Sequence, residues 1–170
     1  MIIFLIGFMG SGKTTAGRLL AERLHYDFAD LDELVENKEE TPITGIFALK
    51  GEDYFREAES RVLETLLDRN RLVVACGGGT PCFFNNMQKM KSAGLTVYLK
   101  VSPGLLARRL SGQHSDRPLV AGMQGEKLKN HIRMLLAGRE GWYRQSNIIY
   151  HADDFDMDEL VNRIKLFPDS

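Results

Sequence analysis

The segment 7–14, with the sequence GFMGSGKT, constrains the fold of this chain more than any other feature. It matches the pattern G-x-x-x-x-G-K-[ST] and follows a continuous apolar run, Ile2–Ile6, which has the character of a strand buried on both faces. Apolar residues then recur at helical spacing from Lys13 onward. This order of strand, glycine-rich turn and helix is typical of a phosphate-binding loop. Glycines let backbone N–H groups approach phosphate oxygens at the positive end of the helix.

Three further apolar runs are short enough to be strands. They are Leu72–Ala75, Thr96–Leu99 and Ile148–Tyr150, and the stretches between them are long enough to hold crossover helices. An α/β fold with a parallel sheet is therefore expected. Because no repeat and no Pro-, Gly- or Ser-rich linker divides the chain, we expect a single domain over residues 1–170. Segments 36–51 and 111–125 interrupt the pattern, and both are candidate mobile elements over a site.

The composition argues against several classes of partner. The formal net charge is -1, from 22 Lys+Arg against 23 Asp+Glu, so the chain has no overall field that would hold nucleic acid. The two cysteines, Cys76 and Cys82, lack the clustered Cys or His neighbours of a zinc site and are expected to be reduced thiols in the cytoplasm. The apolar start is too short for a signal peptide and has no basic residues before it, so we expect no membrane association.

The phosphate-binding loop has a definite chemistry. Lys13 is expected to reach the β- and γ-phosphates of a nucleotide, and Thr14 to ligate Mg²⁺. The loop alone does not separate a small-molecule kinase from a GTPase, a motor or a nucleic-acid ATPase. No N-K-x-D guanine signature is present, and 170 residues leave little room for the modules of motors and helicases. A compact small-molecule kinase is favoured. Its nucleotide-binding residues in the loop are Gly10, Ser11, Gly12, Lys13, Thr14 and Thr15.

Two carboxylates follow the first helix. Asp30 and Asp32 come at the end of a short candidate strand, where alternation is expected to send both side chains to one side. They could divide the work of holding Mg²⁺ and binding an accepting hydroxyl. The alternative is a solvated acidic turn.

Two more candidates lie further along the chain. Arg56 and Glu59 are three residues apart, on one face of a helix, where Glu59 can fix the guanidinium for a substrate carboxylate. The alternative is an ordinary surface ion pair. The triplet Gly77–Gly79 follows the strand Leu72–Ala75 at its carboxyl end, where open α/β sheets bind ligands. A merely flexible turn is the alternative there.

Taken together, these motifs resemble the shikimate kinase family. The order and spacing of the motifs match the family over about residues 2 to 165. The matching motifs are the phosphate-binding loop, Asp30-Leu31-Asp32, Phe55-Arg56-x-x-Glu59, Gly77–Gly79, Arg117-Pro118-Leu119, and Arg139 with Tyr143. The resemblance implies a three-layer α/β/α P-loop kinase domain with a central parallel sheet of five strands. It also implies a lid at about 112–122 and an acceptor-binding segment at about 31–60.

The resemblance further implies a reaction, which is transfer of the γ-phosphoryl group of ATP to the 3-hydroxyl of shikimate in aromatic amino acid (chorismate) biosynthesis. The enzyme would be an ATP-dependent phosphotransferase with an alcohol acceptor, Mg²⁺ as cofactor and a monomeric state. On the nucleotide side, Asp30 resembles the residue near Mg²⁺, either directly or through water. Arg117 resembles the catalytic lid arginine that reaches the phosphates. Arg109 resembles the arginine that packs against adenine, although Arg108 beside it leaves that assignment open.

On the acceptor side, the resemblance implies that Asp32 is the catalytic partner of the accepting hydroxyl. Arg56 and Arg139 would hold the shikimate carboxylate, with Glu59 orienting Arg56, and the backbone of Gly77, Gly78 and Gly79 would contact the ring hydroxyls. Two rival interpretations remain. Another small-molecule kinase, for gluconate or nucleoside monophosphates, would share the loop but lack this combination of residues. A nucleotide-binding switch would need neither the paired carboxylates nor the paired arginines.

Overall fold

The protein forms one five-stranded sheet in which every strand pairing is parallel. The computed structural model describes residues 1–111, 119–120 and 122–167. The strands are β1 Ile2–Ile6, β2 Asp27–Asp30, β3 Leu72–Ala75, β4 Leu95–Lys100 and β5 Ile148–His151, in the order β2-β3-β1-β4-β5. The predicted α/β class and the predicted strands are therefore confirmed.

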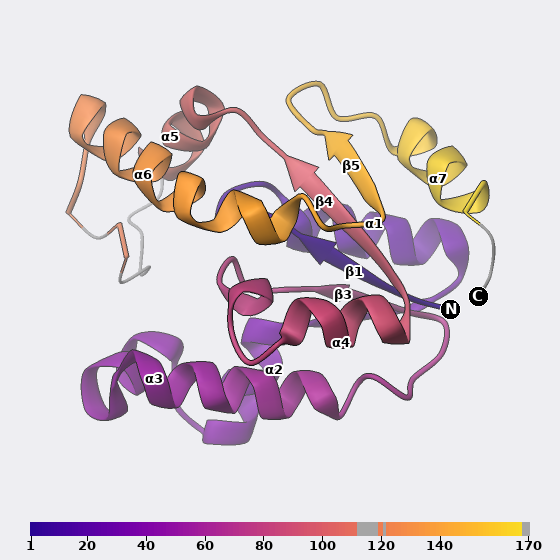
Figure 1. Ribbon diagram of the computed structural model, residues 1–170, viewed down its shortest axis with the longest axis horizontal. Helices are drawn as coiled ribbons and strands as arrows, with labels where there is room; N and C mark the ends of the chain where they lie inside the picture. The colour runs from indigo at the N-terminus through magenta and orange to yellow at the C-terminus, as the bar shows by residue number, and fades with distance from the viewer. Residues whose placement is uncertain (112–118, 121, 168–170) are drawn as a thin grey trace.

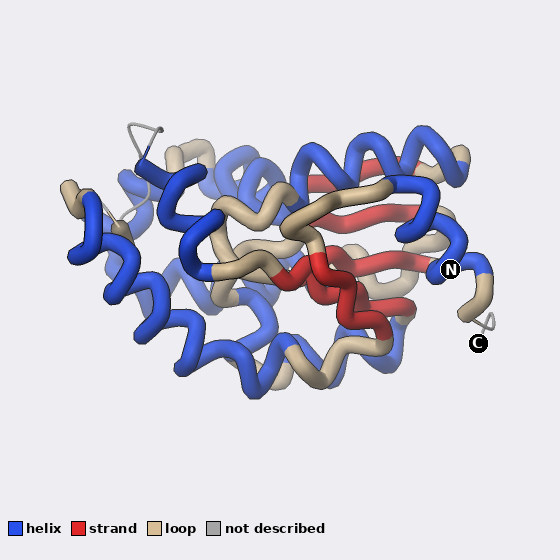
Figure 2. Tube along the Cα trace, turned by 90° about the horizontal axis from the view of Figure 1, so that it is seen from above, coloured by secondary structure: helices blue, strands red, loops and turns tan. Residues whose placement is uncertain are grey.

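Helices cover both faces of this sheet (Figures 1 and 2). The described helices are α1 Lys13–Leu24, α2 Leu31–Glu39, α3 Ile43–Glu64, the 3-10 turn η1 Thr80–Cys82, α4 Asn86–Ala93, α5 Pro103–Ser111, α6 Gly125–Tyr143 and α7 Met157–Lys165. Helix α1 contacts β1, β2 and β3 on one face and also contacts α7. Figure 1 shows α4 and α6 in front of the strands, with α1 behind them. Helices α2 and α3 contact each other beside the β2 edge of the sheet.

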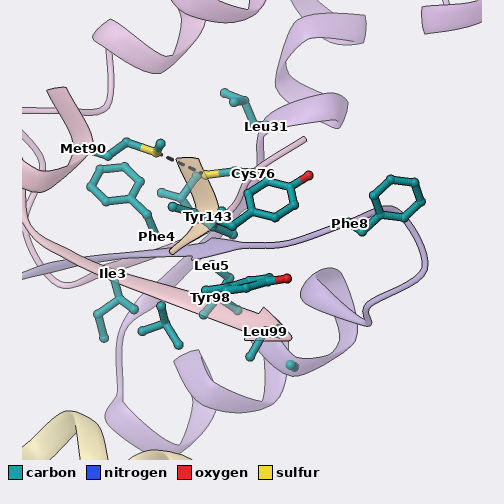
Figure 3. Close-up of a cluster of buried hydrophobic side chains, with 14 of the residues drawn as sticks. Ile3, Phe4, Leu5, Phe8, Leu31, Cys76, Met90, Tyr98, Leu99 and Tyr143 are labelled. Atoms are coloured by element: carbon teal, nitrogen blue, oxygen red, sulfur yellow. Dashed lines mark hydrogen bonds between the residues drawn. The ribbon is translucent and has the colours of Figure 1, made fainter. Parts of the chain in front are cut away.

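The core lies on both sides of β1, where all five residues of the strand are fully buried. This burial explains why Ile2–Ile6 is continuously apolar rather than alternating. Figure 3 shows Phe4, Tyr98 and Tyr143 within this cluster, and the rings of Tyr98 and Tyr143 have centroids 5.1 Å apart. Cys76 belongs to the same core, because its Sγ lies 3.6 Å from Met90 Sδ.

The strand order places the site. The connection from β1 leads two positions to one side of the sheet, to β2, whereas the connection from β3 leads two positions to the other side, to β4. The loops after β1 and β3 therefore leave neighbouring strands in opposite directions. Such a switch point opens a crevice at the carboxyl ends of the strands, where ligands bind in open α/β sheets. The loop after β1 is the phosphate-binding loop, and the loop after β3 is Gly77–Gly79.

Two segments that interrupt the sequence pattern have different outcomes. In the segment 36–51, residues 43–49 form the first part of α3, which has a kink at Gly51 (φ 83°, ψ 172°). The lid expected at 112–122 lies mostly outside the described residues, and Arg117 is among those left out. In the described part of the chain, no helix combines the length and the apolar character needed to span a membrane.

Candidate active site

The phosphate-binding loop joins the end of β1 to the first turn of α1. Gly10 and Gly12 have φ angles of 79° and 90°, a left-handed conformation that glycine adopts without a Cβ penalty. The Lys13 ammonium donates hydrogen bonds of 2.9 Å to the carbonyl oxygens of both Gly7 and Phe8. The lysine side chain is therefore folded over the loop that it follows.

A hydroxyl and a carboxylate meet beside the loop. Thr14 Oγ1 donates a 2.6 Å hydrogen bond to Asp30 Oδ2, while Asp30 Oδ1 accepts from the backbone N–H of Asp32 at 3.0 Å. Asp30 is thus the N-cap of α2. The expected strand alternation of Asp30 and Asp32 is wrong, because α2 begins at Leu31 and Asp32 lies in its first turn. The two carboxylates nevertheless line the same cavity, which favours a shared site over a solvated acidic turn.

Two cavities meet at this point. The first has a volume of about 620 Å³ and is lined by the phosphate-binding loop, Asp30 and Arg109, among others. The second has a volume of about 500 Å³ and is lined by α2, α3, Gly77–Gly79 and Arg139. Both cavities are lined by Asp32, Gly77 and Gly78. A group bound in one cavity can therefore reach a group bound in the other beside the Asp32 carboxylate.

Arg56 and Glu59 form a buried ion pair in α3, with 5% and 0% of their side chains exposed. The alternative of a surface ion pair is therefore wrong. Arg56 Nη1 donates to Glu59 Oε2 at 3.1 Å, and Thr80 Oγ1 donates to Glu59 Oε1. Burial raises the pKa of Glu59, against the opposing effect of the Arg56 charge. Glu52 also accepts from Arg56, so two carboxylates hold one guanidinium.

The glycines after β3 leave room for the buried ion pair, because a side chain at Gly77 or Gly79 would collide with it. A Cβ on Gly77 would lie 2.4 Å from Glu59 Oε1, and a Cβ on Gly79 would lie 2.5 Å from Arg56 Cζ. Side chains at these positions would displace the buried ion pair, so a merely flexible turn is excluded. The Tyr143 hydroxyl, whose pKa is raised by burial, donates to the carbonyl oxygen of Gly78. The turn is thereby attached to α6.

Arg139 comes from α6 and lines the second cavity. Its guanidinium carbon lies 5.7 Å from the centroid of the Phe8 ring, and within the described residues it makes no ion pair with a carboxylate. Arg56 and Arg139, which are far apart in sequence, therefore line one cavity. A cavity with two guanidinium groups favours an anionic ligand.

The structure also distinguishes the two neighbouring arginines of α5. Arg109 lines the first cavity and donates a 3.1 Å hydrogen bond from Nη1 to the carbonyl oxygen of Gly10. Arg108 is exposed and lines a separate cavity between α5 and α6. Successive helix residues point about 100° apart, so only one of the pair can face the loop.

Several site residues were not expected from the sequence. Glu52 and Thr80 hold the buried ion pair, and the only available signal for Glu52 was its spacing four residues before Arg56. The first cavity includes Leu19 of α1 and, from the loop between β5 and α7, Ala152 and Phe155. Phe47 and Phe55 line the second cavity, and their ring centroids are 4.9 Å apart. Residues of this kind have no motif, because only the tertiary fold brings them together.

A phosphate-binding loop that opens into a second, arginine-lined cavity defines the class of protein, a P-loop phosphotransferase with a small-molecule acceptor. Comparison with known proteins identifies the family. The shikimate kinase family model matches residues 9–167, which is most of the chain. A shikimate kinase of Azobacteroides pseudotrichonymphae genomovar. CFP2 is 40% identical over 163 residues, covering 95% of this chain and 96% of the relative. The chain belongs to the shikimate kinase family.

Solved structures agree with this membership. A crystal structure of shikimate kinase from Bacteroides thetaiotaomicron has a TM-score of 0.90 at 36% identity and covers 97% of this chain and 96% of that one. The shikimate kinase of Acinetobacter baumannii in complex with shikimate has a TM-score of 0.86 at 36% identity, covering 96% and 90%. The predicted family and fold are therefore confirmed.

Proposed function

We propose that this protein transfers the γ-phosphoryl group of ATP to the 3-hydroxyl of shikimate. The observation that carries the proposal is the junction of the two cavities at Asp32, Gly77 and Gly78. Nucleotide phosphates at the loop and a hydroxyl in the second cavity would meet there. The structure of the relative from Acinetobacter baumannii in complex with shikimate supports the choice of acceptor.

On the nucleotide side, we assign Lys13 and the backbone of residues 10–15 to the phosphates, and Arg109 to the base. Mg²⁺ would be held by the oxygens of Thr14 and Asp30, which already lie 2.6 Å apart and are the hard oxygen donors that this ion prefers. When it is bound, the ion neutralises part of the negative charge on the phosphates. Arg117, which is not among the described residues, remains our prediction for the lid arginine.

On the acceptor side, Arg56 and Arg139 would hold the shikimate carboxylate, since a guanidinium offers two parallel donors that match a carboxylate. The backbone of Gly77–Gly79 would contact the ring hydroxyls. Asp32 would align the accepting hydroxyl, and it need not be a strong base because phosphoryl transfer passes through a loose transition state. One chain lines both cavities, so a monomer suffices for this chemistry. We also propose that the enzyme acts in the cytoplasm.

The test combines a substrate panel with a carboxylate-free analogue. ADP release with Mg·ATP is measured against shikimate, quinate, gluconate and nucleoside monophosphates, and shikimate should give the highest kcat/KM. Arg139→Lys should raise KM for shikimate by about tenfold or more and leave KM for ATP unchanged, because lysine lacks the planar fork. With an analogue whose carboxylate is replaced by hydroxymethyl, the substitution should cost little further. An equal loss with both acceptors would contradict the assignment of Arg139, and ADP release independent of any acceptor would favour a nucleotide-binding switch.

A further inference from the structure

The Arg56 guanidinium is held by two carboxylates, Glu52 and Glu59. A guanidinium carries five N–H groups in one plane. Nε and Nη2 both donate to Glu52 Oε1, at 3.2 and 3.0 Å, and this pair forms one side edge. Nη1, the other terminal nitrogen, donates to Glu59 Oε2 at 3.1 Å. One N–H on each terminal nitrogen remains, and the end edge is the edge between Nη1 and Nη2, where two such donors can lie in parallel.

The surroundings of the guanidinium restrict it further. Its carbon lies 5.0 Å from the centroid of the Phe55 ring and 4.8 Å from that of Phe83. A Cβ at Gly79 would lie 2.5 Å from Cζ, Nη1 and Nη2 alike, so the glycine backbone packs directly against the group. The end edge thus keeps the paired donors that a planar carboxylate needs.

We propose that Glu52 is a positioning residue for the acceptor, because it fixes the rotation of Arg56 so that the end edge is presented to the second cavity. The inference rests on the proposed function, in which Arg56 holds the acceptor carboxylate. Glu59 makes a single hydrogen bond to the guanidinium and leaves rotation about the side chain open, whereas the added contacts of Glu52 with Nε and Nη2 remove that freedom. Glu52 is absent from the described lining of the second cavity, so it acts through Arg56.

The carboxylate of Glu52 has two opposing effects. Its oxygen orients the guanidinium, but its negative charge disfavours an anionic acceptor bound to the same arginine. A glutamine would keep the accepting oxygen and remove the charge, whereas an alanine would remove both. Replacement by glutamine and replacement by alanine should therefore have different consequences. The Glu52 side chain is 42% exposed, so neither change opens the core.

The experiment measures kcat and KM for shikimate in Glu52→Ala and Glu52→Gln. Glu52→Ala should raise KM for shikimate about tenfold, the size expected for losing a hydrogen bond to a charged group, with kcat and KM for ATP unchanged. Glu52→Gln should keep KM for shikimate at or below the parent value. Glu57→Ala is the matched control, because Glu57 lies on the same helix but pairs with Arg61 on the exposed side. The control should leave both constants unchanged.

A second arm separates this inference from the proposed function. In an Arg56→Lys background, which itself should raise KM for shikimate, adding Glu52→Ala should have little further effect because lysine has no edges to orient. If Arg56→Lys raises KM and Glu52→Ala does not, Glu52 is not a positioning residue but the carboxylate contact stands. Equal increases in Glu52→Ala and Glu52→Gln, or a full effect in the Arg56→Lys background, would also overturn the inference. If Arg56→Lys leaves KM unchanged, the proposed contact and the role of Glu52 both fail.

Discussion

At the scale of single residues, one side chain of the site can make two contacts with different roles. Asp30 uses one carboxylate oxygen to cap α2 and the other to accept from Thr14. The cap is what turns the chain into a helix immediately after β2, and this turn brings Asp32 to the junction of the cavities. One residue thus has both a structural role and a proposed role in holding Mg²⁺.

The two carboxylates should respond differently to substitution by asparagine. Asp30→Asn keeps a capping oxygen but removes a charge beside Thr14, so it should raise the Mg²⁺ concentration needed for half-maximal rate. Asp32→Asn should lower kcat by about 10²-fold at saturating Mg²⁺, since the hydroxyl loses its acceptor. Magnesium titrations of kcat for both variants check this division of roles. Identical titration curves would contradict it.

The buried carboxyl of Glu59 should make stability depend on pH. Its pKa is raised by burial above the ordinary value of 4.5, so the folded protein binds this proton more tightly than the unfolded chain does. Between the two pKa values the folded state therefore holds more protons. The free energy of unfolding should fall as the pH rises from the unfolded value through the folded one.

Glu59→Gln isolates this contribution, because glutamine cannot titrate. Urea denaturation from about pH 4 to about pH 8 should show the parent losing stability relative to Glu59→Gln as the pH rises. A parent that gains relative stability over this range would mean that the Arg56 charge outweighs burial. The pKa of Glu59 would then be lowered.

At the scale of elements, the kink in α3 sets the position of the acceptor-side residues. Gly51 has φ 83° and ψ 172°, a conformation that is essentially restricted to glycine. The helical segment after it begins at Glu52 and carries Arg56 and Glu59 at successive turns. Lys50 before the kink and Tyr54 after it both contact Glu39 of α2. The two halves of α3 are therefore fixed to α2 across the break.

Gly51→Ala should strain this break. The substitution should lower the free energy of unfolding by about 1–3 kcal/mol and raise KM for shikimate, because relief of the strain moves Glu52 and Arg56. Gly104→Ala in α5 is the matched control, since no atom lies within 4 Å of its added Cβ and its backbone is not left-handed. The control should be neutral or stabilising by up to about 1 kcal/mol. Equal effects of the two substitutions would contradict the role of the kink.

At the scale of the whole molecule, the fold and the chemistry rest on different residues. The sheet is stabilised by strands such as β1, which is buried on both faces, whereas the loop that follows it faces the first cavity. The strand order places this loop beside Gly77–Gly79, and the cavities form where the two loops diverge. Changes in the loop should therefore affect activity without unfolding the protein.

Lys13→Ala and Ile3→Ala test this separation. Lys13→Ala should reduce kcat by about 10²–10³-fold, because the ammonium neutralises charge in the transition state, while the melting temperature changes little. Ile3→Ala should lower the free energy of unfolding by about 2–5 kcal/mol through loss of buried surface and a cavity in the core. Thermal melts and kcat measured on both variants check the prediction. A Lys13→Ala protein with a near-normal kcat would contradict the proposed mechanism.

The sequence by itself determined the elements and most of the chemistry. The apolar runs identify the strands because residues buried on both faces of a sheet must be apolar, and the glycine pattern identifies the phosphate-binding loop because few other residues fit its backbone. Asp30, Asp32, Arg56 and the glycine triplet were found through their spacing, and all of them line the two cavities. These signals are local, so they can be recognised along the chain.

Only the tertiary structure decided how these residues meet. It placed Asp32 in a helix rather than a strand, because the chain is capped at Asp30 and β2 ends there, two residues before Asp32. It showed that Arg56 and Glu59 are buried, that Arg109 and not Arg108 faces the loop, and that Glu52 takes one edge of the guanidinium. Burial and the direction of a side chain depend on contacts between elements far apart in sequence. The spacing of residues along the chain carries no information about those contacts.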